Sequence, residues 1–157
     1  MIRVMHRSAV ALVFLVFVAV AARAGEVATL GDLAIVSPWA RASIGTSRPA
    51  AAFLSVTNRG AESDRLVAIE SPVAARAMAH RTTMENGVMK MEPAGAVEIP
   101  AGGTVTFKPG GLHIMLMKLR QPLKKGGTLS LTLRFERAGA VTIEAPIAGP
   151  GASGPPE

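Results

Sequence analysis

The chain has 157 residues, enough for one domain with a substantial core, and its formal net charge is +6. It contains no cysteine, which excludes disulfides, zinc–thiolate sites, thiol nucleophiles and the blue-copper site, which needs a thiolate. The positive charge is mild and scattered, and the chain has one tryptophan and no tyrosine. These features are unlike the basic, aromatic surface of a nucleic-acid-binding protein, so we expect no nucleic-acid partner.

The first 24 residues are typical of a secretory signal peptide. The basic start MIRVMHR is followed by the apolar run SAVALVFLVFVAVA and by small residues that suit cleavage near Ala24. The apolar run has about 14 residues, fewer than the roughly 20 that a membrane-spanning helix needs. Removing this segment lowers Lys plus Arg from 17 to 14 against 11 acidic residues, so the net charge becomes +3. We therefore predict an exported protein.

The rest of the chain predicts β-structure throughout. Turn signals rich in Gly, Pro and Asn separate short, partly alternating apolar runs, and no stretch keeps a helical period beyond two turns. Strands at this spacing favour a β-sandwich or a barrel. The Gly/Pro-rich tail, 148–157, is predicted to be disordered, which leaves 25–147 as a single domain. The predicted strands are 51–58, 64–70, 103–108, 112–120, 128–137 and 140–147.

A further hairpin is predicted at 82–91, with the sequence TTMENGVMKM. Its central Asn-Gly pair is the strongest short hairpin signal and favours a two-residue type I′ turn. That turn pairs Met84 with Met89 and places Met91 diagonally from His80 on the same face. A slip of one residue would move the two sets to opposite faces, so this prediction depends on the turn type.

Histidine and methionine are unevenly distributed in this sequence. Methionine that serves only as core filler should be spread through the core. Instead, every histidine and methionine after the signal peptide lies between positions 78 and 117, which favours a binding site. These residues are Met78, His80, Met84, Met89, Met91, His113, Met115 and Met117.

Two His–Met pairs stand out within this segment. His80 and Met91 share one face of the predicted hairpin, and His113 and Met115 are alternate residues on one face of a later strand. Two imidazoles and two thioethers, without a carboxylate or a thiolate, suit Cu(I) far better than zinc, magnesium or calcium. Four neutral ligands also leave the charge of the ion in place, which favours the lower oxidation state.

Each of these residues also has an ordinary structural explanation. A single histidine is more often a satisfied core or strand residue than a ligand, and methionine packs well in irregular spaces. Met89 shares the face of Met91 and could shield a site, whereas Met84 could cap it from the turn. Met117 is expected in the core or beside the site, and Met78 in packing.

The spacing of the two pairs, H-x(10)-M-x(21)-H-x-M, resembles the signature of the periplasmic copper chaperones of the PCu(A)C type. The segments SPWARAS, AAFLSVTN, DRLVAIESPVA, IPAGGTV and KPGGLHIMLMKLRQPLKKGGTLSLTL agree with it, and the resemblance covers about residues 30–147. It implies an all-β, cupredoxin-like and immunoglobulin-like β-sandwich. It also implies one Cu(I) per chain, bound by His80, Met91, His113 and Met115.

The resemblance further implies a role in the periplasm. Copper would be delivered towards the CuA centre of cytochrome c oxidase, with an oxidase subunit or another periplasmic copper-transfer protein as partner, and a monomeric chain is expected. Some members have a methionine directly after the first histidine, where this chain has Arg81. Some carry a His- and Met-rich C-terminal extension that binds further copper. The tail here contains neither residue, so we expect a single copper site.

Three other functions fit the sequence less well than that of a chaperone. An enzyme is disfavoured because no nucleophile–base pair remains once both histidines belong to the site, and two thioethers oppose redox cycling. A copper storage or resistance protein is a poorer match, since one site per chain stores little. An exported β-sandwich that binds a partner without metal would use its methionines as an adaptable surface. The sequence therefore predicts a copper chaperone and not an enzyme.

Overall fold

The computed structural model describes residues 25–156, and the predicted signal peptide lies outside them. The described part of the chain forms eleven strands joined in one sheet. Among these residues, no helix is long and apolar enough to cross a membrane. The strands are β1 (Glu26–Leu30), β2 (Leu33–Arg41), β3 (Ala50–Asn58), β4 (Asp64–Glu70), β5 (Ala74–Glu85), β6 (Val88–Pro93), β7 (Val97–Ile99), β8 (Thr104–Phe107), β9 (Leu112–Leu119), β10 (Thr128–Phe135) and β11 (Gly139–Ala148).

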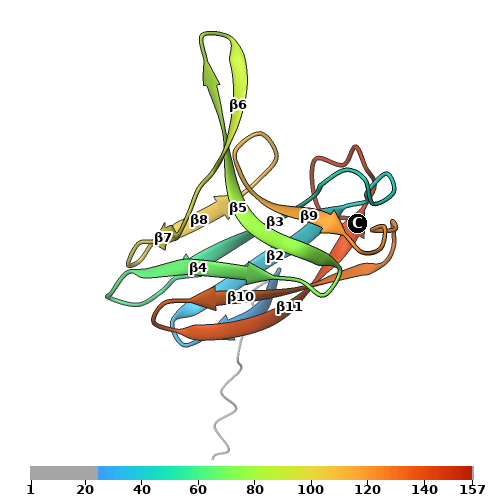
Figure 1. Cartoon of the computed structure of the whole chain (residues 1–157). Helices are drawn as coiled ribbons and strands as arrows, with labels where there is room; N and C mark the ends of the chain where they lie inside the picture. The colour runs from blue at the N-terminus through green and yellow to red at the C-terminus, as the bar shows by residue number, and fades with distance from the viewer. Residues whose placement is uncertain (1–24, 157) are drawn as a thin grey trace, which may run out of the picture.

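The sheet closes on itself because β3 pairs with both β2 and β9. The closed ring runs β2, β11, β10, β4, β5, β9 and β3, as can be followed in Figure 1. The β2–β11 pair is parallel, and the other strand pairs are antiparallel. Closure leaves few free edges that could recruit another chain. The predicted all-β sandwich is confirmed, in the form of a flattened barrel.

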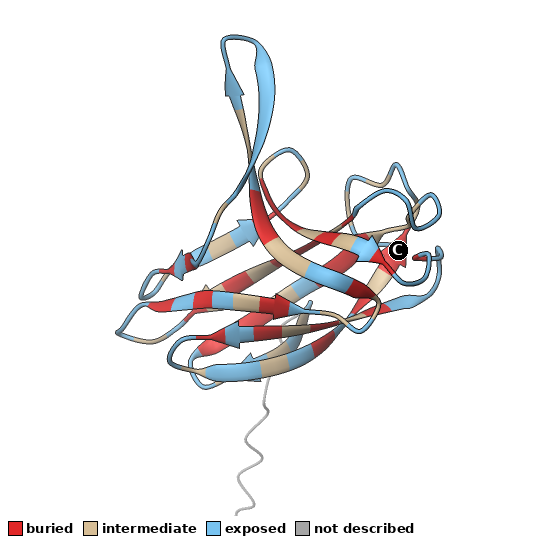
Figure 2. Ribbon diagram, viewed as in Figure 1, coloured by how far each residue is buried: buried red, intermediate tan, exposed pale blue. Residues whose placement is uncertain are grey.

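The core of the barrel follows from the alternation of side chains along each strand. On β10, Leu129, Leu131 and Leu133 point inward and are fully buried, while the residues between them are partly exposed. Figure 2 shows the same alternation of buried and exposed positions on several strands of the barrel. The core therefore lies inside the closed sheet, and side chains on its outer face are free for other roles.

The six predicted strands correspond to β3, β4, β8, β9, β10 and β11, with ends that differ by at most two residues. Three strands were missed: β2 contains a proline, β1 is a short edge strand, and β7 has only three residues. The boundary of the predicted tail also shifts. β11 continues to Ala148, which is buried, and the Arg41 Nε donates a hydrogen bond to the carbonyl of Ala152 at 2.7 Å.

The predicted hairpin is β5 and β6, and it projects from the barrel (Figure 1). Asn86 and Gly87 have φ angles of 51° and 77°, as a type I′ turn requires. The register pairs Met84 with Met89, as predicted from the sequence. All six residues of β6 are exposed, so this hairpin has no barrel beneath it.

Candidate metal centre

The two histidines are direct cross-strand partners on β5 and β9, as the register of this pair shows. The centroids of their rings are 6.1 Å apart, and the ring planes are inclined by 47°. The neighbouring residues Ala79 and Ile114 belong to the barrel core, so both imidazoles lie on the outer face of the sheet. They are nevertheless buried, with 9% of His80 and 6% of His113 exposed.

His80 lies at the base of the projecting hairpin. Up to Arg81, β5 pairs with β9, and from His80 onward it pairs with β6. His80 therefore has His113 on one side and Pro93 on the other. This position joins the rigid barrel to the exposed hairpin.

The two imidazoles differ in their hydrogen bonds. The His113 Nδ1 lies 2.9 Å from the carbonyl oxygen of Gly111, and because a carbonyl only accepts, Nδ1 is the protonated nitrogen. This leaves the His113 Nε2 with a free lone pair. Within residues 25–156, neither the Nδ1 nor the Nε2 of His80 has a hydrogen-bond partner, although both atoms are buried. Burial of the His80 ring, and then repulsion from His113, lowers the pKa of His80 below its ordinary value.

The methionines of the two predicted pairs lie on either side of these rings. Met115 is two residues beyond His113 on the same face of β9, and it is half-buried. Met91 lies opposite Thr82, which is two residues beyond His80 on the same face of the hairpin. The register thus gathers His80, His113, Met91 and Met115 on one continuous face.

One neighbour of this cluster was not expected at the site. Met78, predicted to serve in packing, lies directly opposite Met115 and is half-buried. Met117 lies opposite Arg76, two residues beyond Met115 and further from the histidines. The sequence offered no signal for the Met78–Met115 pair, because it depends on the long-range register between β5 and β9.

Aromatic residues continue the same outer face across β3 and β2. Ala52 pairs with Ile114, so the next residue, Phe53, lies beside His113 in the register. Phe53 pairs with Trp39, and their ring centroids are 4.4 Å apart. Both aromatic rings are buried, so Trp39 is a packed aromatic residue. In the register, Phe53 borders the imidazole pair on the β3 side of the face, and Trp39 lies beyond it on β2.

The distance between the imidazoles suits one shared ion. A metal–nitrogen bond of about 2 Å places the ring centroid about 3 Å from the metal, and the observed separation of the centroids is 6.1 Å. Among the described residues, no three His, Cys, Asp or Glu side chains are grouped to hold a metal. The thioethers of Met91 and Met115 are the further soft donors on this face.

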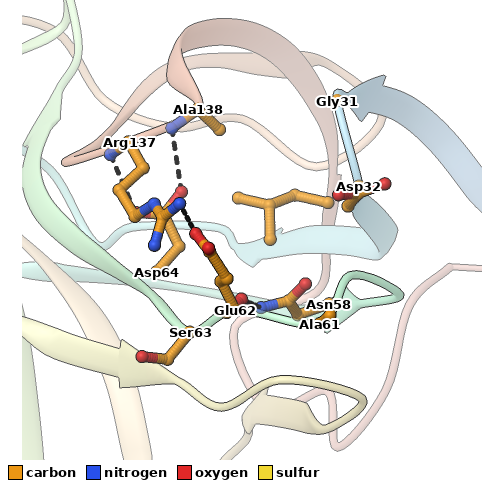
Figure 3. A pocket seen from close by; sticks show the side chains of 10 residues that line it. Gly31, Asp32, Asn58, Ala61, Glu62, Ser63, Asp64, Arg137 and Ala138 are labelled. Carbon is orange, nitrogen blue, oxygen red and sulfur yellow. Dashed lines mark hydrogen bonds and ion pairs between the residues drawn. The ribbon is translucent and has the colours of Figure 1, made fainter.

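A separate cavity of about 470 Å³ lies beside the turns at 31–33, 58–64 and 137–138 (Figure 3). The carboxylate of Asp64 accepts hydrogen bonds from the backbone nitrogens of Arg137 and Ala138, each 2.9 Å long. Burial alone would raise the pKa of Asp64. Hydrogen bonds from backbone N–H groups, of which that of Arg137 has the largest effect, lower this pKa below its ordinary value. Glu62 forms an ion pair with the Arg137 side chain. These contacts tie the turns together and give this cavity a structural role.

Comparisons of the sequence identify its relatives. The family model of the LpqE-like lipoproteins matches residues 33–147. A Leifsonia xyli protein named as a lipoprotein, Lxx21020, is 37% identical over 110 residues, which cover 69% of this chain and 65% of that protein. The uncharacterized protein RP573 of Rickettsia prowazekii is 32% identical over 105 residues, covering 64% and 58% of the two chains. The chain thus spans less than two thirds of the length of these relatives.

Several solved structures with the same fold are named as PCuAC domains. The apo PCuAC domain of PmoF2 has a TM-score of 0.68 and 29% identity, covering 82% of this chain and 98% of that one. The copper-bound PmoF2 domain has the same TM-score and 28% identity, covering 79% and 98%. Cu(I)-bound DR1885 from Deinococcus radiodurans has a TM-score of 0.56 and 32% identity, covering 71% and 75%. With its family model matched over 33–147, the chain belongs to the LpqE-like family, and its fold is that of PCuAC domains.

Proposed function

We propose that this protein is an exported copper chaperone that binds one Cu(I) through His80, Met91, His113 and Met115. The observation that carries the proposal is the buried imidazole pair, in which both nitrogens of His80 lack partners. A buried polar group without a hydrogen bond costs about 1–3 kcal/mol, so a second role is required to explain it. A metal ion bound to one of the two His80 nitrogens would give that nitrogen a partner.

The chemistry of the four side chains favours Cu(I) over other ions. Imidazole and thioether are borderline and soft ligands, and the set contains no carboxylate for a hard cation and no thiolate. Because all four ligands are neutral, they do not offset the charge of the ion, and the lower charge of Cu(I) costs less to bury. The copper-bound forms of PmoF2 and DR1885 support the choice of metal.

Delivery of the ion would proceed by ligand exchange. Met91 is the most exposed of the four residues and lies on the projecting hairpin, so an acceptor can approach the ion from this side. Each coordinate bond to the chaperone breaks as one to the acceptor forms, and no electron is transferred. We propose a periplasmic acceptor on the route to the CuA centre of cytochrome c oxidase.

X-ray absorption of the Cu(I)-loaded protein tests the ligand set. The proposal expects two nitrogen and two sulfur neighbours, and the Met91→Leu variant should lose one sulfur. Leucine keeps the apolar volume, so the change reports the thioether itself. Met117→Leu is the matched control, since Met117 lies one row further from the histidines, and it should leave the spectrum unchanged. A copper environment of nitrogen and oxygen alone would overturn the proposal.

A further inference from the structure

The β5–β6 hairpin exposes three methionines that the barrel does not explain. The exposed fractions are 65% for Met84, 65% for Met89 and 49% for Met91. An alternating apolar face on a hairpin normally packs against a core, yet every residue of β6 is exposed. Packing within the part of the chain that the structure describes therefore gives no reason for methionine at these positions.

The two faces of the hairpin differ sharply in chemistry. Cross-strand partners share a face, so Thr82, Met84, Met89 and Met91 lie together, and we call this the thioether face. It continues to His80 and carries no charged side chain. The charged residues of the hairpin all lie on the opposite face, and they are Arg81, Glu85, Lys90 and Glu92. Lys90 forms an ion pair with Glu85 there.

The spacing on the thioether face allows three sulfurs to converge. Met84 and Met89 are direct partners, so their Cβ atoms are roughly 4.5–5.5 Å apart. Met91 lies two residues from Met89 on the same strand, roughly 7 Å away and within reach of long, flexible side chains. Three neutral thioethers form a soft donor set that suits Cu(I) and is poor for zinc or calcium.

We infer that Met84, Met89 and Met91 form an outer Cu(I) site at the tip of the hairpin, through which copper enters and leaves the inner site. This inference rests on the proposed function of the inner site. Met91 belongs to both ligand sets, so it can hold the ion while the other ligands exchange. Met84 and His80 are four residues apart on β5, which is roughly 13 Å along the strand. Only coordinate bonds form and break, and the ion remains Cu(I).

Methionine methyl signals in ¹H–¹³C NMR spectra test the outer site directly. Cu(I) alone is titrated without oxygen into a His80→Ala/His113→Ala variant, which lacks both inner imidazoles. The signals of Met84, Met89 and Met91 should shift together, whereas those of Met78, Met115 and Met117 should not. Adding Met84→Leu and Met89→Leu should abolish the shifts. If no methyl signal moves, or if Met115 moves with Met91 alone, the outer site does not exist.

Loading kinetics provide a second test that does not remove the histidines. The Met84→Leu/Met89→Leu variant should still bind one tight Cu(I), but it should take up Cu(I) from a chelator roughly tenfold more slowly, the scale of losing a supporting metal contact. Met117→Leu is the control and should load at the wild-type rate. An unchanged rate in the double variant would make the face an apolar docking surface at most and overturn the inference. Absence of tight Cu(I) binding by the wild-type protein would instead refute the inner site. The experiment therefore distinguishes failure of the inner site from failure of the outer site.

Discussion

The two histidines at the site are held in different ways, although they face each other. The bond from the His113 Nδ1 to the carbonyl of Gly111 fixes the ring orientation and leaves Nε2 available. The same carbonyl accepts the backbone N–H of Thr82 at 3.2 Å, which ties β5 to the loop before β9. His80 has no such bond, so its ring can adjust to an ion. One proposed ligand is thus preorganised and the other adaptable.

The buried, unpartnered ring of His80 should make the metal-free protein less stable than it could be. We expect His80→Leu to raise the free energy of unfolding of the apo form by about 1 kcal/mol, because it removes buried polar atoms without hydrogen bonds. Urea unfolding of the apo proteins measures this change. His113→Leu is the comparison: it loses the bond to Gly111 and should gain less. A lower stability of His80→Leu would show that the ring nitrogens are satisfied in the apo protein.

The pH dependence of copper binding follows from the protonation of His80. Because burial and then the nearby His113 lower its pKa, the neutral ligand form persists below the ordinary histidine pKa of about 6.5. Cu(I) affinity should therefore stay constant from pH 8 to about that value and fall at lower pH, as protons compete for the imidazole. Chelator competition at a series of pH values measures this. Affinity that is flat from pH 8 to 5 would contradict imidazole ligation.

At the scale of single residues, the sequence predicted which residues share a face but not which residues lie beside them. The spacing of His80, Met91, His113 and Met115 identified the cluster that the register brings to one face. Met78 could not be placed, since its contact with Met115 depends on which strands pair. No local pattern encodes that pairing.

Among the secondary-structure elements, the β5–β6 hairpin was the most predictable. Its register follows from the Asn86-Gly87 turn, in which both residues have positive φ. β1, β2 and β7 were harder to predict from the local pattern. β1 is an edge strand, β2 contains a proline, and β7 has only three residues. These strands are defined mainly by the partners they meet in the barrel.

The turn of the hairpin offers a test at this scale. Gly87→Val places a β-branched residue at a φ of 77°, which should cost roughly 1–2 kcal/mol and loosen the register that positions Met91. Amide exchange in β6 should accelerate, and Cu(I) affinity should fall. Gly126→Val is the matched control, with a φ of 85° and equally open surroundings, in a turn that carries no proposed ligand. Equal loss of copper affinity in both variants would show that only general stability matters.

For the whole molecule, strand spacing alone left a sandwich and a barrel equally open. The choice depends on the pairing of β2 with both β3 and β11, a contact between distant segments that local patterns do not specify. The same closure separates the site from the core. Leu129, Leu131 and Leu133 pack inside the barrel, while both histidines lie on its outer face. Substitutions at the site should therefore alter copper binding far more than folding.

The most direct test of this account is Cu(I) binding to the purified protein under reducing conditions. Competition with a Cu(I) chelator gives the stoichiometry and the affinity, measured beside a His113→Ala/Met115→Ala variant. We expect one tight Cu(I) per chain in the wild type and an affinity at least about 100-fold lower in the variant, since two proposed ligands are lost. Equal binding by the two proteins, or no tight binding by the wild type, would contradict a copper site at this imidazole pair.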